Sequence, residues 1–372
     1  MNHLLTLLIS TALLATTSCK KDTTPLGSKA ELDQWLEEEL DLQYIPAMAV
    51  LAFDDAEILY ENYLGQSTRE TGLPLEGDHL FLLASISKTI TATALLQQYD
   101  QGKFQLDDPI NNHLPFRVEV PGQSTPITFR MLLTHTSGIA DGAAMDAEYY
   151  NGQDSPKALD AWLESYLVPG GSNYNATDNY YSFQPGTQHE YSNAGSALIG
   201  VLVEQLSGMD FNSYCKQHIF QPLGMNNTHW RLDEITETIA VPYDYINRNW
   251  ETHQHYTFTD YPNGGLRSTA RDMHRFVQMM AANGSFQGQH ILKAATVQAM
   301  LSPQIPSIDN QVGLHLFVMN STEGLWGHDG GEKGTSTIMA WNPATGKGAI
   351  VLCNQGEADL DPVLTEVYRF IR

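Results

Sequence analysis

Ser85 and Lys88, three residues apart in "LLASISKTIT" (82–91), are side chains that could act as a nucleophile and its base. On a helix, residues i and i+3 face the same side, with Cβ atoms roughly 5–6 Å apart. The amine could take the serine proton if burial lowered its pKa from the reference of about 10.4. The apolar residues of the same stretch predict that burial. Backbone N–H groups at the helix start would then stabilise a developing oxyanion.

The S-x-x-K spacing occurs twice more, as Ser18 with Lys21 and as Ser213 with Lys216. The first pair straddles an expected processing site and would not survive as a unit. The second lies in "DFNSYCKQHIF", an amphipathic helical stretch, where both side chains are expected to face solvent. Location therefore favours Ser85, although the motif alone leaves a structural role for it open.

A serine–lysine enzyme also needs a proton route to its leaving group, commonly a Tyr or Ser, and an amide that holds the substrate. The chain has five Y-x-N triplets, beginning at Tyr60, Tyr149, Tyr191, Tyr245 and Tyr261. One of them stands in "PGTQHEYSNAGSALIGVLVEQLSG", between a Pro-Gly turn and an apolar helix that Gly208 closes. A turn ahead of a buried helix can present two polar side chains to a pocket, so Tyr191 and Asn193 are the candidates.

A third stretch, "GHDGGEKG", holds His328-Asp329-Gly330, the only H-x-G of a chain with 13 His. It is followed by Gly331 and then by a strand. Glycines let a backbone approach a ligand closely, so the Gly331 N–H is expected to be a second oxyanion donor beside that of Ser85.

The elements that would position these residues follow from the patterns around them. Ser28 is the expected cap of a first helix, a hairpin turns at Asp54-Asp55, and the helix after Ser85 ends at Gly102. Residues from about 107 to 295 are expected to be mostly helical and loop-like. Three strand-like runs, "VGLHLFVM", "TSTIMAWN" and "GAIVLCN", and a helix close the chain. The predicted fold class is α/β (α+β), an antiparallel sheet built from both chain termini and flanked by helices.

The first residues predict export. Residues 1–18 read as a signal peptide whose apolar run is too short to span a membrane. Cys19 follows a small residue, as in bacterial lipoproteins, and is the expected site of acylation, with plain secretion as the alternative. A linker at 19–30 and one hydrolase domain at 31–372 complete the predicted organisation. The protein is expected in the cell envelope, held to the membrane by its lipid only.

The charge and cysteine content of the chain restrict the classes of molecule that it is expected to bind. With 43 acidic and 20 basic residues the net charge is −23, which repels nucleic acid and anionic membrane surfaces. Cys215 and Cys353 have no C-x-x-C or His-spaced companion and are expected to be buried free thiols rather than a disulfide framework. The expected partner is a small-molecule or peptide substrate with a hydrolysable carbonyl.

Together these stretches resemble the serine β-lactamase and penicillin-recognising superfamily, in particular its class C β-lactamase, D,D-peptidase and esterase-like branch. The resemblance rests on "SISKTITA", "ITFRMLLTHTSGI", "PGTQHEYSNAGSALIG", "PNGGLRSTARDMHRF" and "GHDGGEKG", which follow the order of that family. It implies a β-lactamase/transpeptidase-like fold and covalent acyl-enzyme hydrolysis of an amide, lactam or ester without a cofactor.

The resemblance assigns roles residue by residue. Ser85 resembles the acylated nucleophile, Lys88 its base and Tyr191 the proton-shuttling tyrosine. Asn193 resembles the amide that binds the substrate's acylamide, and Gly330 and Gly331 are expected to line the substrate site. His328 occupies the place of Lys in the K-T-G of many β-lactamases, so efficient β-lactam hydrolysis is not implied. His135 and Ser137 of "LTHTSGI" and the Thr269–Asp272 capping pair are expected to be structural.

Two other classes of function remain as alternatives. A non-catalytic penicillin-recognising sensor would keep this fold without turnover. A metallohydrolase would use His253 and His255 of "HQH", but that pair has no acidic companion at ligand spacing, so surface histidines are expected there.

Overall fold

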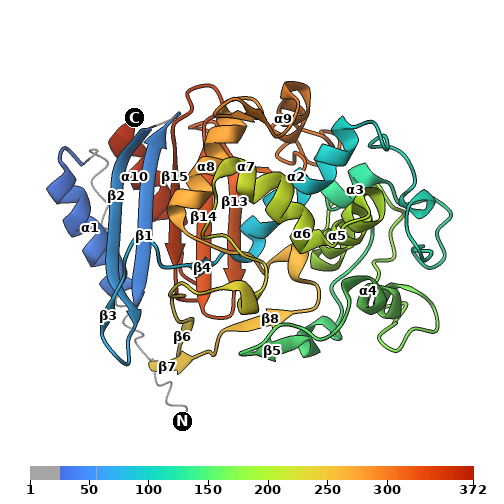
Figure 1. Cartoon of the computed structure of the whole chain (residues 1–372), viewed down its shortest axis with the longest axis horizontal. Helices are drawn as coiled ribbons and strands as arrows, with labels where there is room; N and C mark the ends of the chain where they lie inside the picture. Colours follow the sequence, from blue (N-terminus) through green and yellow to red (C-terminus); the bar gives the residue numbers. More distant parts are fainter. Residues whose placement is uncertain (1–25, 56) are drawn as a thin grey trace, which may run out of the picture.

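The computed structural model describes residues 26–55 and 57–372. Its centre is a seven-stranded antiparallel sheet in the order β12-β13-β14-β15-β1-β2-β3 (Figure 1). Strands from both ends of the chain meet where β1 pairs with β15, with Val50 opposite Val351. The strands are β1 (Ala47–Asp54), β2 (Glu57–Thr68), β3 (Leu73–Pro74), β12 (Phe317–Asn320), β13 (Leu325–Glu332), β14 (Thr335–Trp341) and β15 (Gly348–Cys353).

Strand β1 is buried on both of its faces, as its nearly continuous apolar sequence AMAVLAFD requires. Alternate side chains of a strand point to opposite faces. Ala49 and Leu51 therefore pack into the larger core beneath the helical region, and Met48 and Val50 pack into a smaller core beneath α1 and α10. The sheet thus separates two layers of helices.

The helices divide between these two layers. In Figure 1, α1 and α10 lie with the strands at the left of the molecule, α8 lies over the sheet, and α4, α5 and α6 lie to the right. The helices are α1 (Lys29–Leu42), α2 (Ser87–Asp100), α3 (Phe129–Leu133), α4 (Leu159–Leu167), α5 (Asn193–Ser207), α6 (Phe211–Cys215), α7 (Gln221–Leu223), α8 (Ala270–Ala281), α9 (Ala294–Met300) and α10 (Asp361–Ile371). Among the described residues, no helix has the length and apolarity needed to cross a bilayer.

The predicted start and stop residues are confirmed where local chemistry sets them. The Ser28 hydroxyl accepts from the Glu31 N–H at the start of α1, and that of Thr269 accepts from the Asp272 N–H at the start of α8. Gly208 ends α5 in a left-handed conformation with φ 73°. Cys215 and Cys353 are buried free thiols, as expected.

The predicted strands near the C-terminus need two corrections. The run "VGLHLFVM" is a strand only from Phe317, because His315 has a positive φ of 52° and interrupts the extended chain. The glycine-rich stretch around His328 was placed ahead of a strand, whereas it is itself part of β13. Glycine lowers strand propensity, so the pairing with β14 decides that conformation.

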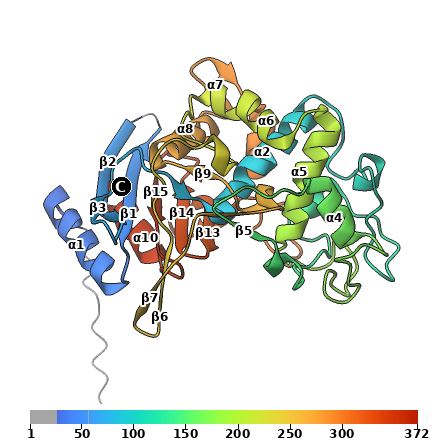
Figure 2. The same ribbon diagram turned by 60° about the horizontal axis from the view of Figure 1, so that its bottom comes forward.

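The middle region also contains short two-stranded sheets that its sequence did not predict. Figure 2 shows one of them, the β6–β7 hairpin, projecting from the body of the molecule. The pairs are β4 (Phe81–Leu82) with β9 (Arg267–Ser268), β5 (Tyr149–Asn151) with β8 (Tyr256–Phe258), β6 (Tyr243–Ile246) with β7 (Asn249–Thr252), and β10 (Ser285–Phe286) with β11 (Gln289–His290).

Candidate active site

Ser85 lies in a 3₁₀ turn (Ala84–Ile86) that continues directly into α2. The residue before it, Ala84, has φ 48°, a left-handed conformation that costs free energy for any residue with a Cβ. Strain of this kind persists only where the surroundings impose it. Here the Thr337 hydroxyl of β14 donates to the Leu83 carbonyl at 2.8 Å and fixes the chain just before the serine.

Lys88 contacts Ser85 as the sequence predicts. Its Nζ lies 2.9 Å from the Ser85 Oγ and donates to the Asn263 carbonyl at 2.7 Å. The lysine is fully buried, and burial lowers its pKa to about 7, although the carboxylates of Asp141 and Asp260 act in the opposite direction. A large fraction of the amines is therefore neutral near pH 7 and able to accept the serine proton.

Tyr191 joins this pair from the turn that precedes α5. Helix α5 packs against α2, so the turn reaches the start of α2. The Tyr191 hydroxyl is within hydrogen-bonding reach of Ser85, and the Lys88 Nζ lies 4.8 Å from the centre of its ring. The side chain is 36% exposed, but its hydroxyl points to the buried end, and this burial raises the pKa above the ordinary tyrosine value. Tyr191 therefore stays protonated and can donate a proton.

Asn193 is the first residue of α5, and Asp141 holds it in place. The Asp141 carboxylate accepts from the Asn193 N–H and Nδ2 and from the Ala194 N–H, each at 2.9 Å. A carboxylate at the start of α5 also interacts favourably with the positive end of the helix dipole. With its Nδ2 donating to Asp141, the Asn193 side chain can offer its Oδ1 as an acceptor to a substrate N–H.

Strand β13 forms the opposite wall of the site. Its pairing with β12 ends at Gly327, so residues 328–332 lie at a sheet edge. A Cβ on Gly330 would lie 2.5 Å from the Leu83 carbonyl and 2.9 Å from the Ser85 backbone nitrogen, so only glycine fits there. This close approach brings the backbone of Gly330 and Gly331 to the start of α2, where the two expected oxyanion donors would lie.

His328 is buried behind this wall. Its ring lies edge-on to Tyr191, with centroids 6.3 Å apart, and its Nδ1 lies 2.5 Å from the Asp329 carbonyl oxygen. Burial and the neighbouring Lys88 amine lower the pKa of His328 to about 4. The imidazole is therefore uncharged near neutral pH, and its covered Nε2 has no hydrogen-bond partner among the described residues.

Comparisons with known proteins identify the family of this chain. The sequence model of the Beta-lactamase family matches residues 32–370. The chain belongs to the Beta-lactamase family. The predicted family and fold class are thereby confirmed. Related proteins of the superfamily with esterase or β-lactamase activity are serine hydrolases.

Relatives within the family differ in their named activities. Penicillin-binding protein 4* of Bacillus subtilis is 28% identical over 330 residues, which is 83% of this chain and 68% of that protein. Esterase EstB of Burkholderia gladioli is 33% identical over 243 residues, 63% of this chain and 59% of the esterase. The D-amino acid amidase of Ochrobactrum anthropi SV3, solved with D-phenylalanine, has the same fold, with a TM-score of 0.71, 22% identity and coverage of 92% and 98% of the two chains.

Sequence reasoning missed the residues of this Beta-lactamase family site that hold the lysine. In the sequence, Asn263 is only the end of a Y-x-N triplet, yet its backbone carbonyl accepts a hydrogen bond from the Lys88 amine. Its side-chain Nδ2 donates to the Asp260 carboxylate at 2.6 Å. The stretch "PNGGLRSTARDMHRF" matched the family as a motif. It did not point to Asn263, because any residue type can supply a backbone carbonyl as a hydrogen-bond acceptor.

The Tyr60 triplet and the Ser213–Lys216 pair have other surroundings. Tyr60 lies in β2 and donates to Asp33 at 2.6 Å. Ser213 and Lys216 are both exposed, as expected. The Tyr149 hydroxyl donates at 3.0 Å to Glu332, the last residue of β13. Cys19 lies outside the described residues.

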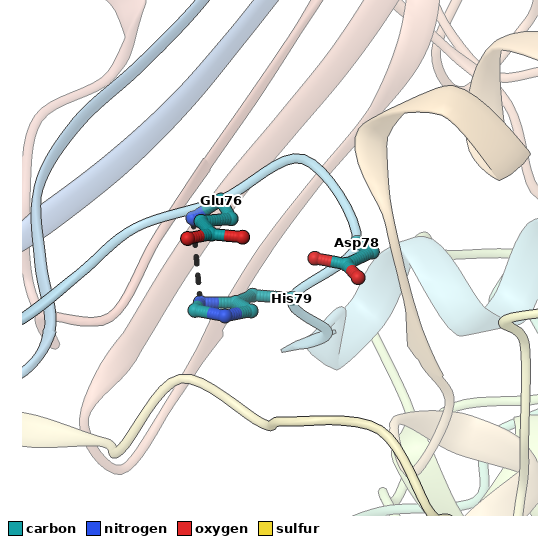
Figure 3. Close-up of side chains that lie close together, drawn as sticks. All are labelled: Glu76, Asp78 and His79. Carbon is teal, nitrogen blue, oxygen red and sulfur yellow. Dashed lines mark hydrogen bonds between the residues drawn. The ribbon is translucent and has the colours of Figure 1, made fainter.

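Metal-binding geometry occurs elsewhere. His253 pairs with Asp244 at 2.7 Å, and neither His253 nor His255 belongs to a cluster of potential ligands within the described parts of the chain. The cluster that does meet the geometric test is Glu76, Asp78 and His79, in the connection between β3 and β4 (Figure 3). The Nδ1 of His79 already accepts from the Glu76 backbone N–H at 3.4 Å, and nothing links this cluster to Ser85.

Proposed function

We propose that this protein is a serine hydrolase that forms a covalent acyl-enzyme at Ser85 with amide or ester substrates. One observation carries the proposal: the Ser85 Oγ lies 2.9 Å from a buried lysine whose pKa is lowered to about 7. A neutral amine at that distance can accept the proton as the oxygen attacks a carbonyl carbon. The tyrosine and the two backbone N–H groups supply the remaining parts of acyl transfer.

The substrate is proposed to lack a carboxylate at the position where K-T-G enzymes hold one. An uncharged, covered His328 offers no permanent cation there, and Asp329 beside it is largely exposed. The carboxyl groups of Asp141, Asp260 and Glu332 also act on the lysine, and burial raises the pKa of Asp260 to about 7. Esters and amides without a carboxylate, including amides of D-amino acids, are therefore favoured over β-lactams, which carry a carboxylate.

Intact-protein mass spectrometry after exposure to a fluorophosphonate and, separately, to a fluorescent penicillin tests this function. We expect one fluorophosphonate adduct, absent in Ser85→Ala, and slower labelling by the penicillin. Ser213→Ala removes the serine of the exposed S-x-x-K pair and should label like the wild type. Folded wild-type protein that takes neither label would instead indicate the non-catalytic sensor.

A further inference from the structure

The sequence assigned His135 a structural role in a turn, and its backbone does serve one. The residue has φ 53°, and its N–H donates to the Leu132 carbonyl at 3.3 Å. The same residue also reaches the loop that carries the catalytic tyrosine. The Glu190 N–H donates to the His135 carbonyl at 2.9 Å, and the Ser192 N–H donates to the His135 Nδ1 at 3.1 Å.

These two hydrogen bonds hold the chain on both sides of Tyr191. Between them the His135 ring stacks on the Tyr191 ring, with centroids 4.3 Å apart and planes inclined by 26°. His135 is 1% exposed, so the phenol rests on a ring that cannot move into solvent. The Tyr191 ring also contacts Lys88, whose amine lies 4.8 Å from the centre of that ring.

The protonation state of His135 fits this arrangement. Because its Nδ1 accepts a backbone N–H, the neutral ring carries its hydrogen on Nε2. Burial, with His315 and Lys88 as neighbours, lowers the pKa of His135 below its ordinary value. The ring therefore places no charge beside the lysine. Because Nε2 carries the hydrogen, it has no free lone pair with which to bind a metal ion.

We propose that His135 is a positioning residue that holds the Tyr191 hydroxyl between Ser85 and the leaving group. This inference rests on the proposed function. In acylation, the Ser85 Oγ bonds to the carbonyl carbon and its proton passes to the Lys88 Nζ. When the bond to the leaving group breaks, Tyr191 donates its proton to that group and regains one from Lys88. A phenol displaced on its flexible side chain would miss this transfer.

The test is His135→Asn, with His315→Asn as the matched control. Asparagine tolerates a positive φ, and its Oδ1 can accept the Ser192 N–H in place of the ring nitrogen, so the substitution removes mainly the stacking ring. His315 has φ 52°, is fully buried and packs at a tilt of 45° against His135, with ring centroids 4.7 Å apart. Both variants thus remove one buried imidazole from the same cluster at the same backbone conformation.

The readout is kcat/KM for 4-nitrophenyl butyrate and for ethyl butyrate. Ethoxide needs a proton to leave and 4-nitrophenolate does not, so loss of a general acid affects the ethyl ester more, by about 10²-fold. We expect His135→Asn and Tyr191→Phe to share this selective loss, and His315→Asn to lower both activities equally. Equal losses on both esters in His135→Asn would overturn the proposal.

Two further results separate the possible failures. If His135→Asn does not fold, His135→Phe keeps a ring face on Tyr191 and should retain the wild-type ratio of the two activities; loss of that ratio in folded His135→Phe would also contradict the positioning role. If the wild type hydrolyses neither ester and Ser85 takes no fluorophosphonate, the proposed function fails and this inference fails with it.

Discussion

At the scale of single residues, the free-energy cost of burying Lys88 is the central fact of the site. Water stabilises an ammonium group strongly, and the chain replaces that water with two hydrogen-bond partners, the Ser85 Oγ and the Asn263 carbonyl. The remaining penalty lowers the lysine pKa to about 7. The same penalty that makes the lysine a base must therefore also destabilise the folded protein.

The pH dependence of this penalty has a definite sign. The Lys88 pKa is lower in the folded than in the unfolded chain, so the unfolded chain binds more protons between about pH 7 and about pH 10.4. The free energy of unfolding therefore rises with pH across this window, as the destabilisation due to buried Lys88 is relieved. Below pH 7 the full destabilisation is present. Acylation should rise with pH through the same pKa of about 7 and level off above it.

We expect Lys88→Met to abolish labelling of Ser85 and to raise the free energy of unfolding at pH 7. The advantage over the wild type should shrink toward pH 10, by at most about 1.4 kcal/mol per pH unit. Urea unfolding at several pH values measures it. Lys216→Met, at an exposed position, should show no such trend. A stability difference for Lys88→Met that is constant with pH would contradict the lowered lysine pKa.

At the scale of elements, the site is an interface between the start of α2 and the edge of β13. Two threonines of β14 lie against the chain that leads into α2. The Thr337 hydroxyl donates to the Leu83 carbonyl at 2.8 Å, and the Thr335 hydroxyl proton is shared between the carbonyls of Cys353 at 2.9 Å and Leu82 at 3.1 Å. Gly330 then fills the remaining space. The separation between the start of α2 and β13 is thus set by these hydrogen bonds and by the direct backbone contact at Gly330. Both contacts hold the oxyanion donors in place.

Gly330→Ala should lower the acylation rate constant by about 10² or more, because its Cβ would push β13 away from the Ser85 N–H. A Cβ on Gly331 would have no heavy atom within 4 Å, and alanine there keeps the N–H, so Gly331→Ala should show the smaller loss. Stopped-flow fluorophosphonate labelling of both variants compares them. Equal losses would mean that β13 does not supply the close backbone contact on which the oxyanion site depends.

At the scale of the whole molecule, both chain termini build one sheet and so bring distant segments together. Ser85 follows the N-terminal hairpin, His328 to Gly331 lie in the C-terminal strands, and Tyr191 comes from the helical region between them. The site forms only when all three parts are folded. The net charge of −23 disfavours attachment to an anionic membrane through surface charge, and it would not oppose attachment through a covalent lipid.

We propose that Cys19 carries that lipid and holds the enzyme in the cell envelope. The apolar run before it and its small neighbour Ser18 support this proposal. Expression in a Gram-negative host with an alkyne analogue of palmitate should label the wild type and Cys215→Ser, which lacks only a buried thiol. Cys19→Ser should lose both the label and the membrane association. Unlabelled wild type in the soluble periplasm would indicate plain secretion.

Local chemistry by itself determined much of this protein. The caps at Ser28, Thr269 and Gly208 and the central hairpin follow from neighbouring residues, because hydrogen bonds and burial patterns within one segment favour them. The pairing of Ser85 with Lys88 follows from helical spacing for the same reason. These features depend on contacts between residues close in the chain.

Only the tertiary structure decided the rest. The conformation of β13 depends on β14, since glycine has little strand preference of its own. The low lysine pKa depends on burial by segments that meet from across the chain, and its carbonyl partner Asn263 is a backbone group that any residue could supply. The stacking of His135 on Tyr191 likewise joins two loops far apart in sequence. Such contacts leave no local pattern, because their free energy arises only when the whole sheet and its helices are assembled.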